Sequence, residues 1–178
     1  AHARGADIWV RTKCISAARD GDHWRVVLED VETEKRRVVL AKALVNAAGP
    51  WVENVIESIY GPSDTLQVRL VRGSHIVVPR LYDHDRAYIF QNEDGRILFA
   101  IPYEGAFTLI GTTDEVHQGR LDYVSITDDE GRYLCEAAKQ YFHKSPGVED
   151  VVWSYSGVRP LYNDGATAAH EATRDYVL

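Results

Sequence analysis

The sequence contains no methionine and only two cysteines, Cys14 and Cys135, among its 178 residues. The cysteines lie far apart and match no metal-ligand spacing, so we expect free thiols in a reducing compartment and no metal site. No apolar run is long enough to cross a membrane as a helix. Basic residues are also in the minority, with 20 Lys and Arg against 27 Asp and Glu and a formal net charge of −7. Because binding of polyanions depends on positive charge, we expect no nucleic-acid partner.

What the sequence does contain is a normal complement of apolar and charged residues, 45% and 26%, which is typical of a folded globular protein. Residues 8–40 predict a meander of strands, with turns at residues 20–21 and 33–35. Residues 43–48 form a short apolar run of the buried-strand type. A helix over residues 51–60 follows, with Pro50 at its start. We expect the chain to cross into a second domain after Gly61.

The second part of the sequence is again rich in strands. Residues 68–78, 87–91, 96–103, 107–111 and 151–158 alternate or run apolar, and tight turns join several of them. Consecutive strands with short turns favour an antiparallel sheet. One helix interrupts them, and Thr127 with Glu130 forms the capping-box pattern at its start. The fold class predicted is therefore α+β, mainly antiparallel.

Three stretches of the sequence carry candidate site residues. Small residues around Gly49 would let a ligand approach the backbone between a strand and a helix, although a tight turn with Trp51 in the core fits as well. His75 stands beside Gly73 in an apolar strand, where it could act as a general base or donate to an anion. The alternative is a hydrogen-bonded core histidine. Residues 111–114 could contact a ligand or simply line a turn.

Two arginines in the last part of the sequence are also candidate site residues. Arg159 ends an apolar strand immediately before Pro160, a position that is costly for a guanidinium unless it meets an anion. Arg174 could complete a fork for a phosphate, because arginine suits planar bidentate recognition. Internal ion pairs, such as Arg159 with Asp164 or Arg174 with Asp175, would satisfy the same residues.

Five motifs that occur here in order resemble those of the aerobic, FAD-dependent glycerol-3-phosphate dehydrogenases, with the α-glycerophosphate oxidases as close relatives. The resemblance covers essentially the whole chain. The motifs are residues 46–51 (Asn-Ala-Ala-Gly-Pro-Trp), 72–79 (Arg-Gly-Ser-His-Ile-Val-Val-Pro), 110–114 (Ile-Gly-Thr-Thr-Asp), 153–160 (Trp-Ser-Tyr-Ser-Gly-Val-Arg-Pro) and 173–176 (Thr-Arg-Asp-Tyr).

This resemblance implies a two-domain flavoenzyme of the D-amino-acid-oxidase-like type. Residues 1–61 would form the C-terminal portion of a split FAD-binding domain, with the later strands of that domain. Residues 62–178 would form a substrate-binding domain built on an antiparallel sheet. The implied site residues are Ala48, Gly49 and Trp51 against FAD, His75 as the catalytic residue, and Arg159 and Arg174 as ligands of the substrate phosphate.

The reaction implied by the resemblance is oxidation of sn-glycerol 3-phosphate to dihydroxyacetone phosphate. Electrons would pass to a quinone, or to oxygen in the oxidase branch. The resemblance also implies a cytoplasmic enzyme bound peripherally to the inner face of the cytoplasmic membrane.

The sequence departs from the family in having no Gly-x-Gly-x-x-Gly unit, which holds the FAD pyrophosphate in this family. We therefore expect the chain to be an internal fragment that retains FAD weakly or not at all and is inactive by itself. Two alternatives remain open at this point. One is a stand-alone anion-binding module without flavin chemistry, and the other is a structural piece whose His75, Arg159 and Arg174 serve only as core and ion-pair residues.

Overall fold

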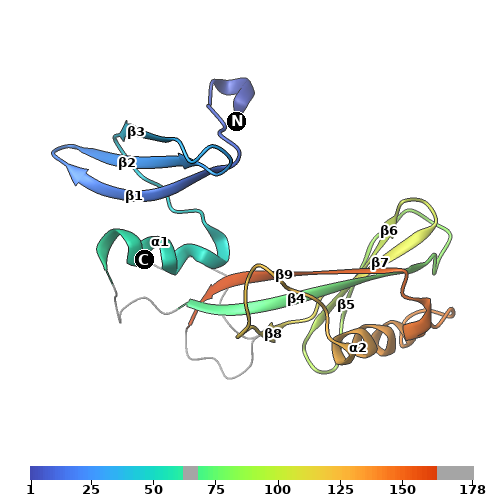
Figure 1. Cartoon of the computed structure of the whole chain (residues 1–178). Helices are drawn as coiled ribbons and strands as arrows, with labels where there is room; N and C mark the ends of the chain where they lie inside the picture. The colour runs from blue at the N-terminus through green and yellow to red at the C-terminus, as the bar shows by residue number, and fades with distance from the viewer. Residues whose placement is uncertain (62–67, 164–178) are drawn as a thin grey trace. The chain divides into compact units, whose positions relative to one another are not determined.

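The computed structural model describes residues 1–61 and 68–163 of the chain (Figure 1). The chain divides into two compact units, Ala1–Leu66 and Gln67–Leu178. Assignment of the first unit to an FAD domain and of the second to a substrate domain stays a prediction.

The first unit is a three-stranded antiparallel meander, β1 (Thr12–Asp20), β2 (His23–Asp30) and β3 (Arg36–Ala41), after a short 3₁₀ helix, η1 (His2–Arg4). The hairpin turn pairs Asp20 with His23, and β2 ends at Asp30, so pairing along β1 stops at Thr12. This explains why the first strand begins four residues later than the pattern from residue 8 predicts. Ala17, Trp24 and Val26 form a small core, against which Ile59 packs.

The prediction of a buried strand over residues 43–48 is wrong. Among the described residues this segment joins no ladder, and Val45 is 84% exposed. An apolar run forms a strand only where a second backbone pairs with it. Instead the Asn46 side chain braces a turn: its Nδ2 donates to the Val52 carbonyl at 3.0 Å, and its Oδ1 accepts from the Ala48 amide at 3.2 Å. The chain then enters a 3₁₀ turn, η2 (Gly49–Trp51), and helix α1 (Val52–Tyr60).

The second unit is built on an antiparallel sheet, which confirms the predicted fold class. Its strands run in the order β5-β6-β7-β4, and β9 pairs along the other edge of β4. The short β8 pairs with Val71 and Arg72 of β4 beyond the end of β7. Their bounds are β4 (Val68–Pro79), β5 (Tyr88–Gln91), β6 (Ile97–Tyr103), β7 (Phe107–Gly111), β8 (Glu115–Val116) and β9 (Trp153–Tyr162).

The proline after Arg159 does not end the last strand, contrary to the expectation from sequence. Pro160 pairs with Leu70, and β9 continues to Tyr162. Within residues 1–61 and 68–163, β9 pairs only with β4 and is therefore an edge strand, where a residue without an N–H is tolerated.

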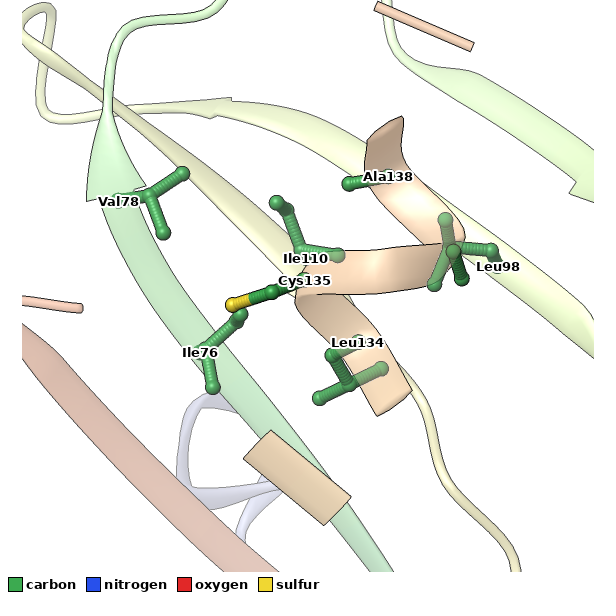
Figure 2. Packing of buried hydrophobic residues seen from close by; sticks show 8 residues of the cluster. Ile76, Val78, Leu98, Ile110, Leu134, Cys135 and Ala138 are labelled. Atoms are coloured by element: carbon green, nitrogen blue, oxygen red, sulfur yellow. The ribbon is translucent and has the colours of Figure 1, made fainter. Parts of the chain in front are cut away.

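Helix α2 (Asp128–Lys139), which precedes a short 3₁₀ helix, η3 (Val148–Asp150), packs on one face of this sheet. The predicted capping box is present, with Thr127 and Glu130 each bonding the other's backbone. Figure 2 shows the resulting core, in which side chains of α2 meet those of β4, β6 and β7. The core residues are Ile76, Val78, Leu98, Ile110, Leu134, Cys135, Ala137 and Ala138. None of the helices in the described part of the chain is long and apolar enough to span a membrane.

Alternation along β4 divides its side chains between the two faces of the sheet. Ser74 and Ile76 face α2, where Ser74 bonds Glu130 and Ile76 joins the core. Gly73 and His75 therefore lie on the opposite face, together with their cross-strand neighbours on β9. We call this the open face.

Candidate active site

His75 lies in the middle of the open face, between two strands. The register pairs it with Gly111 of β7 on one side and with Tyr155 of β9 on the other. The Tyr155 ring stacks on the imidazole with a centroid distance of 4.8 Å and an interplanar angle of 1°. A Cβ atom on Gly111 would overlap the imidazole and lie 2.8 Å from its Nε2. Glycine at position 111 thus provides the space in which the His75 ring lies.

The surroundings of His75 favour its neutral form. Burial lowers the pKa of His75 below its ordinary value of 6.5, and the positive charge of Arg159 lowers this pKa further. Its Nδ1 is buried and makes no hydrogen bond to any part of the chain that the structure describes. A hydrogen-bonded core histidine is therefore not what these residues form. A neutral imidazole near pH 7 has the protonation state that a general base needs.

Arg159 lies on the same face, four residues along β9 from Tyr155, and pairs with Val71 of β4. Its Nη1 is 3.2 Å from Oδ1 of Asp114, and its Nη2 donates to Oγ1 of Thr112 at 3.2 Å. The Asp114 side chain is only 9% exposed, whereas that of Arg159 is 37% exposed. The guanidinium is thus held by two protein contacts and still reaches solvent.

The polar turn after β7 therefore holds the guanidinium of Arg159 in place. The sequence placed residues 111–114 among the candidates but did not connect them to Arg159, and it suggested Asp164 as an ion-pair partner. Asp164 lies outside the described residues, and the observed partner is Asp114. No local signal could have revealed this pair, because it depends on β7 and β9 both flanking β4.

A cavity of about 290 Å³ opens beside the guanidinium. Its polar lining includes Arg159, Asp114 and Thr112, and its apolar lining includes Phe99 and Ile97 of β6. A positively charged group at the rim of a partly apolar cavity suits a small organic anion.

Glycine at position 73 is as important for Arg159 as Gly111 is for His75. A Cβ atom on Gly73 would overlap Nη2 of Arg159 and lie 2.7 Å from Oγ1 of Thr112. We expect Gly73→Ala to displace the guanidinium and weaken binding of a phosphate ligand about 10- to 100-fold, since charge-assisted contacts need exact placement. Isothermal titration calorimetry with a small organic phosphate measures the effect.

The matched control is Gly157→Ala. Gly157 is the cross-strand partner of Gly73, but a Cβ atom there would meet nothing within 4 Å. This variant should bind the ligand like the unaltered protein. Equal weakening in both variants would show that the effect comes from glycine in the sheet and not from Arg159.

The residues expected at FAD belong to the first unit. Gly49 has a φ of 55°, which favours glycine, and a Cβ atom there would meet nothing within 4 Å. Trp51 is 49% exposed, and Ala48 is held by the Asn46 bond. This turn leaves an approachable backbone and an exposed aromatic ring, so the residues fit contact with a flat cofactor.

Arg174, the second arginine expected at the substrate phosphate, lies outside the described residues. In residues 1–61 and 68–163, no three His, Cys, Asp or Glu side chains gather so as to hold a metal ion.

A family model described as FAD dependent oxidoreductase matches residues 1–178. The chain is 43% identical to D-erythritol 1-phosphate dehydrogenase of Brucella abortus over 98% of its own length and 35% of that protein. It is likewise 43% identical to glycerol-3-phosphate dehydrogenase of Pseudomonas aeruginosa, over 100% and 35%. The structure of glycerol-3-phosphate dehydrogenase from Bacillus halodurans complexed with FAD matches with a TM-score of 0.77 and 33% identity, over 93% of this chain and 34% of that one. The chain thus spans about 35% of the length of its curated relatives.

Proposed function

The chain belongs to the FAD-dependent oxidoreductase family, and on that basis we propose that it forms the substrate side of a dehydrogenase that oxidises a polyol phosphate. The substrate proposed is sn-glycerol 3-phosphate and the product is dihydroxyacetone phosphate. The observation that carries this proposal is the placement of His75 and Arg159 on one face of the sheet, close enough for the charge of Arg159 to act on the imidazole.

Arg159 binds the phosphate in this proposal. Asp114 and Thr112 hold the guanidinium from the protein side, while its exposed part faces the cavity. A guanidinium offers several N–H donors in one plane, so it can keep both protein contacts and still pair with phosphate oxygens. Arg174 is proposed as a second phosphate ligand.

His75 acts on the hydroxyl group at C2 of the substrate. Its neutral imidazole takes the hydroxyl proton as the carbon is oxidised, or polarises the C2 oxygen by a hydrogen bond. FAD, when bound, supplies the oxidant that accepts the C2 hydrogen with its electron pair. Ala48, Gly49 and Trp51 are proposed to contact FAD.

We propose a quinone as the electron acceptor and peripheral binding to the inner face of the cytoplasmic membrane, in line with the resemblance to the dehydrogenases. The equal identity to a D-erythritol 1-phosphate dehydrogenase supports a second candidate substrate, D-erythritol 1-phosphate.

The experiment that tests this function compares phosphorylated with unphosphorylated polyols. The FAD-loaded protein that contains these residues is incubated with sn-glycerol 3-phosphate, D-erythritol 1-phosphate or glycerol, and the carbonyl product is measured. We expect oxidation of a phosphorylated polyol and a far lower kcat/KM for glycerol. Equal rates with glycerol, or no oxidation of either phosphate ester, would contradict the proposal.

The pH dependence of kcat/KM provides a further prediction. Because the pKa of His75 is lowered, the base stays neutral as pH falls, and the acid limb of the profile should lie below 6.5. Removal of the charge in Arg159→Gln should move this limb to higher pH, whereas Arg159→Lys keeps the charge and should leave it in place. An acid limb above 6.5 in the unaltered protein would contradict the assignment of His75 as the base.

A further inference from the structure

We propose that Glu130 of α2 is a positioning residue for His75 and Arg159, although it lies on the other face of the sheet. The inference rests on the proposed function of these two residues in binding and oxidising a polyol phosphate.

Glu130 is a buried carboxylate with polar partners on both oxygens. Its side chain is 4% exposed. Oε1 accepts from Ser74 Oγ at 2.8 Å and from Thr113 Oγ1 at 2.7 Å. Oε2 lies 2.8 Å from Nη2 of Arg72 and accepts from the backbone amide of Thr127 at 2.9 Å. One side chain therefore ties together β4, the turn after β7 and the start of α2.

Ser74 and Thr113 are also bonded directly to each other. Thr113 Oγ1 accepts from the Ser74 amide at 2.9 Å, and the Thr113 amide donates to the Ser74 carbonyl at 3.3 Å. Both residues are fully buried or nearly so. Glu130 thus completes a closed network that fixes the turn against the strand.

The neighbours of these two residues in sequence are the parts of the open-face site. His75 follows Ser74 directly. Thr112 and Asp114 flank Thr113 and hold the guanidinium of Arg159. A shift of Ser74 or Thr113 would therefore move the groups that place the imidazole and the guanidinium, because consecutive residues share their backbone.

Glu130 carries a negative charge at neutral pH despite its burial. Burial by itself raises the pKa of Glu130, but the hydrogen bonds from Thr113, Thr127 and Ser74 outweigh it and leave the pKa below its ordinary value. The charge is balanced by Arg72, whose side chain is 18% exposed. An ionised carboxylate accepts on both oxygens, which is what this network needs.

Glu130→Gln should disrupt the network of hydrogen bonds with little change in the shape of the side chain. Its amide group donates on one side, so either the hydroxyls of Ser74 and Thr113 or the donors Arg72 and Thr127 lose their acceptor. Thr127→Ala separates a role restricted to capping α2 from positioning. It removes the cap side chain and its bond to Oε2 of Glu130, but it leaves Ser74 and Thr113 as donors to Oε1.

The first measurement needs no activity. In the full chain labelled at histidine and arginine, nuclear magnetic resonance signals of the His75 ring and the Arg159 guanidinium are compared among the variants. We expect both signals to shift in Glu130→Gln and to stay in place in Thr127→Ala. Unchanged signals in Glu130→Gln, or equal shifts in Thr127→Ala, would overturn the proposal. Because this measurement does not depend on catalysis, it distinguishes a failure of the positioning proposal from a failure of the proposed function.

The second measurement uses the FAD-loaded protein. Misplacement of binding groups by a fraction of an ångström to one ångström can cost about 10- to 100-fold, so KM for sn-glycerol 3-phosphate should rise by that factor in Glu130→Gln and by less than about 2-fold in Thr127→Ala. If Glu130→Gln does not fold, Thr113→Val takes its place, since valine keeps the shape and removes both the bond to Oε1 of Glu130 and the acceptor of the Ser74 amide. An unchanged KM in Thr113→Val would then overturn the proposal.

Discussion

Replacement of His75 by alanine should lower kcat about 10²- to 10⁴-fold, the range typical of a lost general acid or base. KM for sn-glycerol 3-phosphate should change little, because the phosphate is bound by Arg159 and not by the imidazole. Steady-state kinetics of the FAD-loaded protein measures both constants. Added imidazole should restore part of the activity, since Gly111 leaves room where the ring was.

Two observations separate this outcome from a loss of stability. Among the described residues the His75 ring stacks on one aromatic ring, that of Tyr155, and such a pair contributes only about 0.5–1.5 kcal/mol beyond its buried area. The melting temperature of His75→Ala should therefore stay close to that of the unaltered protein. His84→Ala is the matched control, because His84 is exposed and bonds Tyr88 away from β4. If His75→Ala kept its turnover, the imidazole would have no part in the chemistry.

Replacement of Arg159 by lysine should raise KM about 10- to 100-fold and change kcat little. Lysine keeps the positive charge but cannot contact Thr112, Asp114 and a phosphate at once, as the planar guanidinium does. The weaker binding should appear only with phosphorylated substrates. Arg159→Gln should have a larger effect, because glutamine removes the positive charge that contacts Asp114 and is proposed to bind the phosphate.

Arg120→Lys is the control for this substitution. Arg120 pairs with Asp122 on the surface, and its side chain is 83% exposed. Exposed ion pairs contribute about 0–1 kcal/mol, so this variant should retain both kinetic constants. A KM in Arg159→Lys equal to that of the control would mean that the phosphate binds elsewhere.

The features of the fold that the sequence predicted are local ones. Tight turns and alternation identified the antiparallel strands of the second unit, and Thr127 with Glu130 identified the start of α2. His75 and Arg159 were visible as candidates because a charged or titratable group inside an apolar strand needs an explanation. Each of these signals depends on a few adjacent residues.

The features that escaped prediction depend on pairing between distant segments. Ser74 and Ser156, whose hydroxyls are 2.8 Å apart, are separated by 82 positions in the sequence. Only the sheet order brings Asp114 to Arg159 and Gly111 to His75. The expected strand over residues 43–48 failed for the same reason, since the sequence shows an apolar run but not whether a partner strand lies beside it.

Several expectations stay predictions. They include the assignment of residues 1–61 and 62–178 to an FAD domain and a substrate domain, the contacts of Ala48, Gly49 and Trp51 with FAD, and the role of Arg174.

The placement of one substrate molecule against both His75 and Arg159 is tested most directly by a crystal structure of the FAD-loaded protein with dihydroxyacetone phosphate. We predict a phosphate oxygen within hydrogen-bonding distance of the Arg159 guanidinium and the C2 oxygen within hydrogen-bonding distance of Nε2 of His75. A ligand bound away from the open face, or a phosphate held without Arg159, would contradict the proposed site.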